Sequence, residues 1–127
     1  MEGLYVDQEA FLAWIEAHAP GEVLGRVQHA YCCPVRNYLL STDPDRFAGC
    51  WVCWQGQDAW LMCGTIVKRE WLLSFWCGAF MRAIDVMLPR LAPTPFLRTY
   101  VTRETALWML TGDMPRDLVR EDQDATA

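Results

Sequence analysis

The stretch from Trp71 to Leu88, WLLSFWCGAFMRAIDVML, constrains the fold more than any other part of the sequence. Its apolar residues occur in adjacent pairs that repeat every four residues, which is a helical spacing. A surface helix shows a single apolar stripe, whereas these pairs cover most of the circumference. The narrow polar sector that remains consists of Ser74, Gly78, Arg82 and Asp85. The pattern predicts a helix that is nearly surrounded by protein, that Pro89 ends, and whose polar sector meets water, a backbone or a partner.

Shorter patterns predict the elements around this helix. A helix begins after Asp7, another begins at Cys33-Pro34, and a last one begins after Thr102 and ends at Gly112. Two runs rich in Trp, Val and Cys flank Gln55 to Asp58, which predicts a hairpin with a four-residue connection. We therefore predict an α+β fold, with about four helices around the helix at 71–88 and a small antiparallel hairpin or sheet at 50–67.

Length and charge indicate one domain. The 127 residues are 53% hydrophobic, which is enough for a sizeable core, and we expect a single globular domain at 1–112. Residues 1–112 contain eleven acids and nine bases, whereas residues 113–127 contain five acids and two bases, so that we expect an acidic, mobile tail. Because residues 1–112 are close to neutral, they lack the basic face of a nucleic-acid binder.

The location follows from the hydrophobic segments and the cysteines. The apolar run at 71–81 is too short to cross a bilayer, and the N-terminus shows no secretion signal, so we expect no membrane and a cytoplasmic protein. In the cytoplasm the six cysteines should mostly stay reduced. They occupy positions 32, 33, 50, 53, 63 and 77.

Four residues have the composition of a zinc site. His29 and Cys32 form one pair of possible ligands, and Cys50 and Cys53 form a second pair. Three thiolates and one imidazole suit tetrahedral zinc. However, Trp51-Val52 between the second pair favours an extended strand, which would direct Cys50 and Cys53 to opposite faces of a sheet. We therefore expect packed thiols and no cofactor, with a structural zinc domain as an alternative.

Cys33 is the one candidate for a reactive group. If Pro34 begins a helix, Cys33 caps it, and the free N–H groups there can lower the pKa of a thiol. A Cys-Pro at a helix start is similar to the persulfide-carrying site of small sulfur-carrier proteins, although Arg36 replaces the second proline of that family. This resemblance implies a thiol-based module for sulfur transfer or redox chemistry.

Arg82 and Asp85 are the candidate partner-binding residues, because they lie three apart in the polar sector of the predicted central helix. An ion pair within or between helices is the alternative. We find no GxSxG, P-loop, HExxH or GxGxxG motif, and we therefore expect no enzyme.

The order of four segments provides a resemblance. FLAWIEA, CCPVRNYL, the stretch ending in AFMRAID, and VTRETALWML are similar to small uncharacterised bacterial proteins with the order CPxxxYL, FxxxID and VTxxxAL. The resemblance spans about residues 11–110 and implies a shared fold, with no known function.

Together these patterns favour a protein-binding factor. A small Trp-rich domain without a catalytic motif fits a subunit, adaptor or inhibitor of a larger bacterial or phage machine. Its contact patch would consist of exposed aromatic and Met side chains, and a homodimer is a second option.

Overall fold

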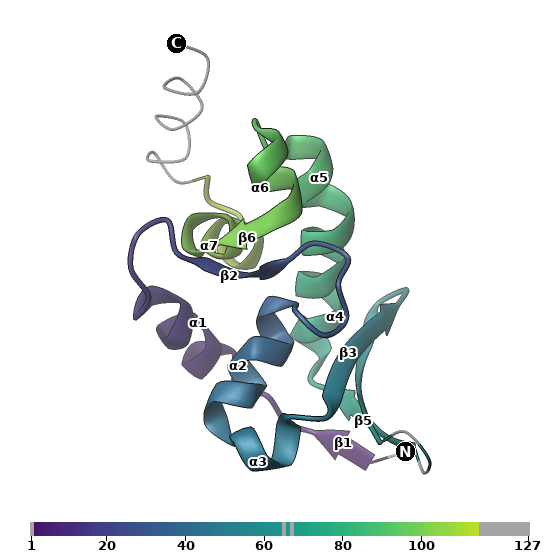
Figure 1. Cartoon of the computed structure of the whole chain (residues 1–127). Helices are drawn as coiled ribbons and strands as arrows, with labels where there is room; N and C mark the ends of the chain where they lie inside the picture. Colours follow the sequence, from purple (N-terminus) through teal and green to yellow (C-terminus); the bar gives the residue numbers. More distant parts are fainter. Residues whose placement is uncertain (1, 65, 67, 115–127) are drawn as a thin grey trace.

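The protein has the predicted α+β fold, with two small sheets and several short helices. A computed structural model describes residues 2–64, 66 and 68–114 (Figure 1). Residues 115–127 of the predicted acidic tail lie outside the described residues. Within the described part of the chain, no helix is long and apolar enough to cross a membrane.

The larger sheet has the strand order β1-β5-β4-β3. Its strands are β1 (Glu2–Leu4), β3 (Cys50–Gln55), β4 (Asp58–Cys63) and β5 (Arg69–Leu73). The hairpin of β3 and β4 was predicted, and its register runs from Cys50 opposite Cys63 to Gln55 opposite Asp58. Gln55 and Asp58 therefore belong to the strands, and the connection is shorter than predicted. Gly56 allows the tight turn because its φ of 61° is open to glycine.

The prediction of helix from Trp71 onward is wrong for its first residues. Trp71 to Leu73 belong to β5, which pairs antiparallel with β4 and parallel with β1. Trp and Leu fit a strand as well as a helix, and partners on both sides of β5 decide in favour of the strand. The helix begins only at Phe75, after Ser74.

The central helix comprises α4 (Phe75–Arg82), η1 (Ala83–Met87) and α5 (Leu88–Leu91). The prediction that Pro89 ends this helix is also wrong, because the chain widens into a π-helical turn in which the Leu88 N–H donates to the Ala83 carbonyl. Pro89 has no N–H for the carbonyl of Asp85. That carbonyl accepts a bond from Gln28 Nε2 at 2.9 Å instead, so the helix continues to Leu91.

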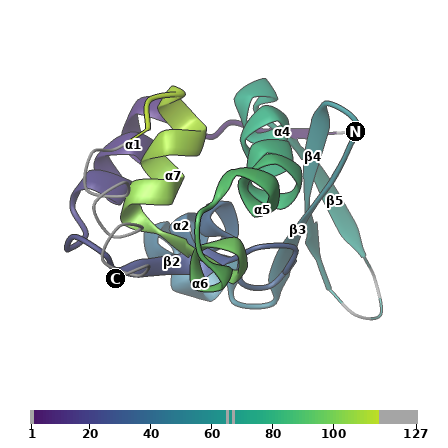
Figure 2. The ribbon, with the colours of Figure 1, turned by 90° about the horizontal axis from the view of Figure 1, so that it is seen from above.

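The other elements pack on one side of the large sheet. They are α1 (Gln8–Glu16), α2 (Pro34–Thr42), α3 (Pro44–Phe47), α6 (Pro95–Thr99) and α7 (Arg103–Thr111). The second sheet pairs β2 (Val23–Arg26) with β6 (Tyr100–Thr102). Figure 2 shows α4 and α5 between the large sheet and the layer that contains α1 and α7. The central helix therefore separates the two layers, and its side chains Cys77, Phe80, Met81, Ile84 and Leu88 are at most 2% exposed.

Candidate functional site

The cysteines are arranged differently from the predicted zinc site. Cys50 forms a disulfide with Cys63, which lies directly opposite it in the hairpin. A disulfide sulfur is no zinc ligand, and among the described residues no group of three His, Cys, Asp or Glu side chains could hold a metal ion. The expectation of reduced cysteines is wrong for this pair. The register of the hairpin brings the two thiols together, and the predicted connection implied this pairing, because Trp54 opposite Ala59 places Cys50 opposite Cys63.

Cys33 caps α2 as predicted, but its chemistry is the opposite of the prediction. The Arg36 N–H donates to Cys33 Sγ at 3.4 Å. The thiol is nonetheless fully buried, and burial raises the pKa of Cys33 to about 12, against the smaller lowering effect of that N–H bond. A thiol with this pKa carries almost no thiolate at neutral pH, so a persulfide-forming or redox role is not supported.

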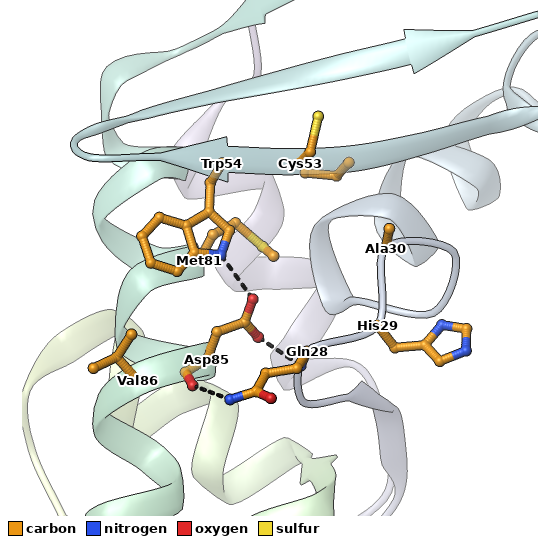
Figure 3. A pocket seen from close by; sticks show the side chains of 9 residues that line it. Gln28, His29, Ala30, Cys53, Trp54, Met81, Asp85 and Val86 are labelled. Atoms are coloured by element: carbon orange, nitrogen blue, oxygen red, sulfur yellow. Dashed lines mark hydrogen bonds between the residues drawn. The ribbon is translucent and has the colours of Figure 1, made fainter.

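Asp85 is the centre of a partly buried hydrogen-bond cluster (Figure 3). Its carboxylate accepts from the backbone N–H of Gln28 at 2.8 Å and from Trp54 Nε1 at 2.7 Å. The cluster lies beside a cavity of about 430 Å³, into which Met81 and Val86 also face. Because both carboxylate oxygens are already bonded to the protein, Asp85 connects the central helix to a loop and a strand, and is not a free ligand for a partner.

Arg82 lies apart from Asp85, on the exposed side of the central helix. Neither residue belongs to an ion pair among the described residues. Arg82 lines a groove of about 500 Å³ between the helix and the β3–β4 turn. The predicted pair of partner-binding residues is therefore divided, with Asp85 in the interior and Arg82 in a surface groove.

The polar sector of the central helix packs on neighbouring backbone. Ser74 Oγ accepts a bond from the Val6 N–H at 2.8 Å, and Gly78 approaches the Gln57 carbonyl so closely that a Cβ would lie 2.0 Å from its oxygen. The residues of the helix that face outward are apolar, except for Arg82 and Arg90. Phe75 is 71% exposed and Met87 is 51% exposed. The sequence showed that this sector would meet water, a backbone or a partner, but its pattern could not decide which.

The outer face of the large sheet is a second exposed apolar surface. Alternation along β3, β4 and β5 directs the same face of each strand away from the central helix. This outer face has the apolar side chains of Trp51, Cys53, Trp60, Met62 and Leu72, and toward its ends the polar side chains of Gln55, Asp58 and Glu70. No described helix lies on it in Figure 2. Tyr31 extends the face, because its ring lies 5.4 Å from that of Trp51.

The outer face is not part of the core. Val52, Leu61 and Leu73 on the opposite side of the same strands are at most 4% exposed. By contrast, Trp51 and Trp60 are only half-buried and do not pack against the core. The sequence indicated the hairpin but not the width of this face, because β5, which widens the sheet, was predicted to be part of the central helix.

Comparison with known proteins provides no further guide to the function. No family model matches the sequence, and neither a curated protein nor a solved structure is significantly similar to it. The resemblance to small uncharacterised bacterial proteins stays an expectation.

Proposed function

We propose that the protein is a non-enzymatic protein-binding factor that contacts its partner through the outer face of the large sheet. The observation that supports this proposal is the row of large apolar side chains, Trp51, Trp60, Met62 and Leu72, which no described element covers. Contiguous exposed apolar patches are rare on proteins that act alone, and Trp, Tyr and Met are enriched where proteins bind one another. The partner belongs to a larger bacterial or phage machine, of which this chain is a subunit, adaptor or inhibitor.

The shape of the outer face also fits protein binding better than it fits catalysis. A β-sheet face is nearly flat, and the candidate chemical groups of the chain lie elsewhere. Cys33 is buried with a raised pKa, and Asp85 is bonded on the other side of the sheet. Aromatic side chains on a rigid sheet provide contact area at a small cost in conformational entropy.

A native mass spectrum of the protein purified from its own host tests this proposal. We expect a complex of defined stoichiometry with another protein, and we expect Trp60→Glu to abolish it while the circular dichroism spectrum is unchanged. Phe96→Glu is the matched control, because Phe96 is 52% exposed and lies on α6, outside the outer face. A complex that survives Trp60→Glu, or a bare monomer of 14.6 kDa, would contradict the proposal. A mass of two chains would identify a homodimer as the occupant.

The proposal includes the cytoplasmic location that the sequence favours. The disulfide between Cys50 and Cys63 opposes this location, because disulfides persist mainly in oxidising compartments. Alkylation of thiols in intact cells, followed by mass spectrometry, distinguishes the cytoplasm from an oxidising compartment. Reduced Cys50 and Cys63 would support the cytoplasm, whereas a disulfide in most molecules would contradict it.

A further inference from the structure

The groove beside the central helix has an apolar floor that is open to solvent. Phe75, Ala79, Ala83, Val86 and Met87 line it along the axis of α4 and η1, and the β3–β4 turn forms one wall. Helices normally direct such a stripe toward the core. Here one apolar face of the helix, with Cys77, Phe80 and Ile84, is directed toward the core, and Ser74 and Gly78 pack against Val6 and Gln57. The second apolar stripe, beside that polar sector, therefore remains outside. The arrangement leaves a stripe of helix that is free to receive a second helix.

Two arginines border this floor. Arg82 and Arg90 line the same groove, both are exposed, and no described carboxylate forms an ion pair with either guanidinium. Some other arginines are engaged: Arg36 donates to the carbonyls of Cys50 and Ala48, and Arg98 donates to that of Ala92. The groove thus combines apolar area with two positive charges, which would be complementary to a partner that presents apolar and acidic side chains together.

We propose that this groove binds an acidic amphipathic helix of another protein. Phe75 and Met87 would receive its apolar side chains, as in other complexes in which a helix occupies a groove. Arg82 and Arg90 lie eight residues apart, which corresponds to roughly 12 Å along a helix. The partner helix would therefore present two carboxylates about two turns apart, with apolar residues between them. This site is separate from the outer face of the sheet, and the proposal does not depend on that face.

A second copy of this chain does not supply such a helix from its described residues. Helix α1 has carboxylates at Glu9 and Glu16, two turns apart, and comes closest to the requirement. However, its apolar residues Phe11 and Ile15 are fully buried in the core of their own domain. They could reach the groove of another copy only if that domain unfolded, and for this reason we assign the groove to a different protein.

Selection of peptides from a random 16-residue phage library tests the proposal without knowledge of the partner. The wild-type protein is the bait, and Arg82→Glu/Arg90→Glu is the counter-bait. We expect enriched peptides with two acidic residues seven or eight apart and apolar residues between them. A synthetic peptide from this set should lose at least tenfold in affinity for the double variant, as measured by fluorescence anisotropy. The same peptide with arginine in place of its acids should bind the double variant better than the wild type.

Two control variants separate this site from others. Arg46→Glu changes the charge of an exposed arginine on α3 and should leave the affinity unchanged. Trp60→Glu, which tests the outer face of the sheet, should also leave peptide binding unchanged. The groove proposal is overturned if no peptide is enriched, if the enriched peptides lack acids, or if they bind Arg82→Glu/Arg90→Glu as tightly as the wild type. None of these results bears on the outer face.

Discussion

At the scale of single residues, Asp85 connects the central helix to the loop after β2 and to strand β3. Its carboxylate and its carbonyl together bond both the backbone and the side chain of Gln28, and its second oxygen accepts from Trp54. Gln28 has a φ of 57°, which lies in the left-handed region that disfavours residues other than glycine, asparagine and aspartate. The bonds to Asp85 stabilise this conformation of the loop. The carboxylate thus joins the loop after β2 to strand β3, in addition to the bond that the Val52 N–H donates to the Ala30 carbonyl.

Replacement of Asp85 by alanine should therefore be costly. The change leaves the Gln28 N–H and Trp54 Nε1 without their acceptor in a part-buried place, and we expect a loss of about 3 kcal/mol in the free energy of unfolding. Urea denaturation followed by tryptophan fluorescence measures it. Asp113→Ala is the control, because Asp113 is exposed, and it should change the stability by less than about 0.5 kcal/mol. Equal stability of the two variants would show that Asp85 does not hold the loop.

At the scale of elements, the contact between α4 and the β3–β4 turn determines which side of the central helix is exposed. Gly78 is the point of closest approach, since any side chain there would meet the carbonyl of Gln57. The hairpin rests on the helix at this position, and its turn forms one wall of the groove that the exposed apolar residues of the helix line. This packing of the hairpin on the helix thus requires a glycine at position 78.

Gly78→Ala tests this contact. Alanine normally stabilises a helix by about 1 kcal/mol relative to glycine. Here its Cβ would lie 2.0 Å from the Gln57 oxygen, which forces the hairpin away, and we expect a net loss of about 2 kcal/mol in thermal or urea unfolding. Gly49→Ala is the matched control, because a Cβ at position 49 would have no neighbour within 4 Å and the stability should hardly change. A stabilised Gly78→Ala protein would refute the contact.

At the scale of the whole molecule, the core contains two buried thiols on different elements, which lie close enough for Cys33 to affect the ionisation of Cys77. Cys33 at the start of α2 and Cys77 on α4 are both 0% exposed. The pKa of each thiol is raised from 9.0 to about 12, mainly by burial, and for Cys77 the proximity of Cys33 is a smaller part of this rise. In the unfolded chain both thiols ionise near their ordinary pKa. The folded protein therefore binds more protons than the unfolded chain between these two values.

This difference predicts how stability depends on pH. The contribution of the two thiols to the free energy of unfolding is complete below pH 9. It is lost as the pH rises toward about 12, by up to about 1.4 kcal/mol per pH unit for each thiol. Urea denaturation between pH 7 and pH 10.5 measures the slope. Cys33→Ala/Cys77→Ala should be less stable at pH 7 but should lose less stability as the pH rises. If both proteins show the same slope, the thiols are not the cause.

The sequence by itself determined the class of the fold and several elements. Periodicity and turn residues located α1, the hairpin and the last helix, whose cap Thr102 and final Gly112 are as predicted. These features are local, since a cap, a tight turn or an apolar period depends on residues a few positions apart. The site of the Cys33 cap was predictable for the same reason.

Only the tertiary structure decided what lies on the surface. Strand β5 and the burial of Cys33 each depend on segments that are distant in the sequence. A helical cap lowers the pKa of a thiol, but burial by other elements raises it more, and the sequence of the cap contains no information about that burial. The same holds for the central helix. Its sequence is apolar over most of the circumference, and only packing decides that Cys77 and Ile84 lie in the core while Phe75 and Met87 stay exposed. The hairpin can approach this helix closely because residue 78 is a glycine.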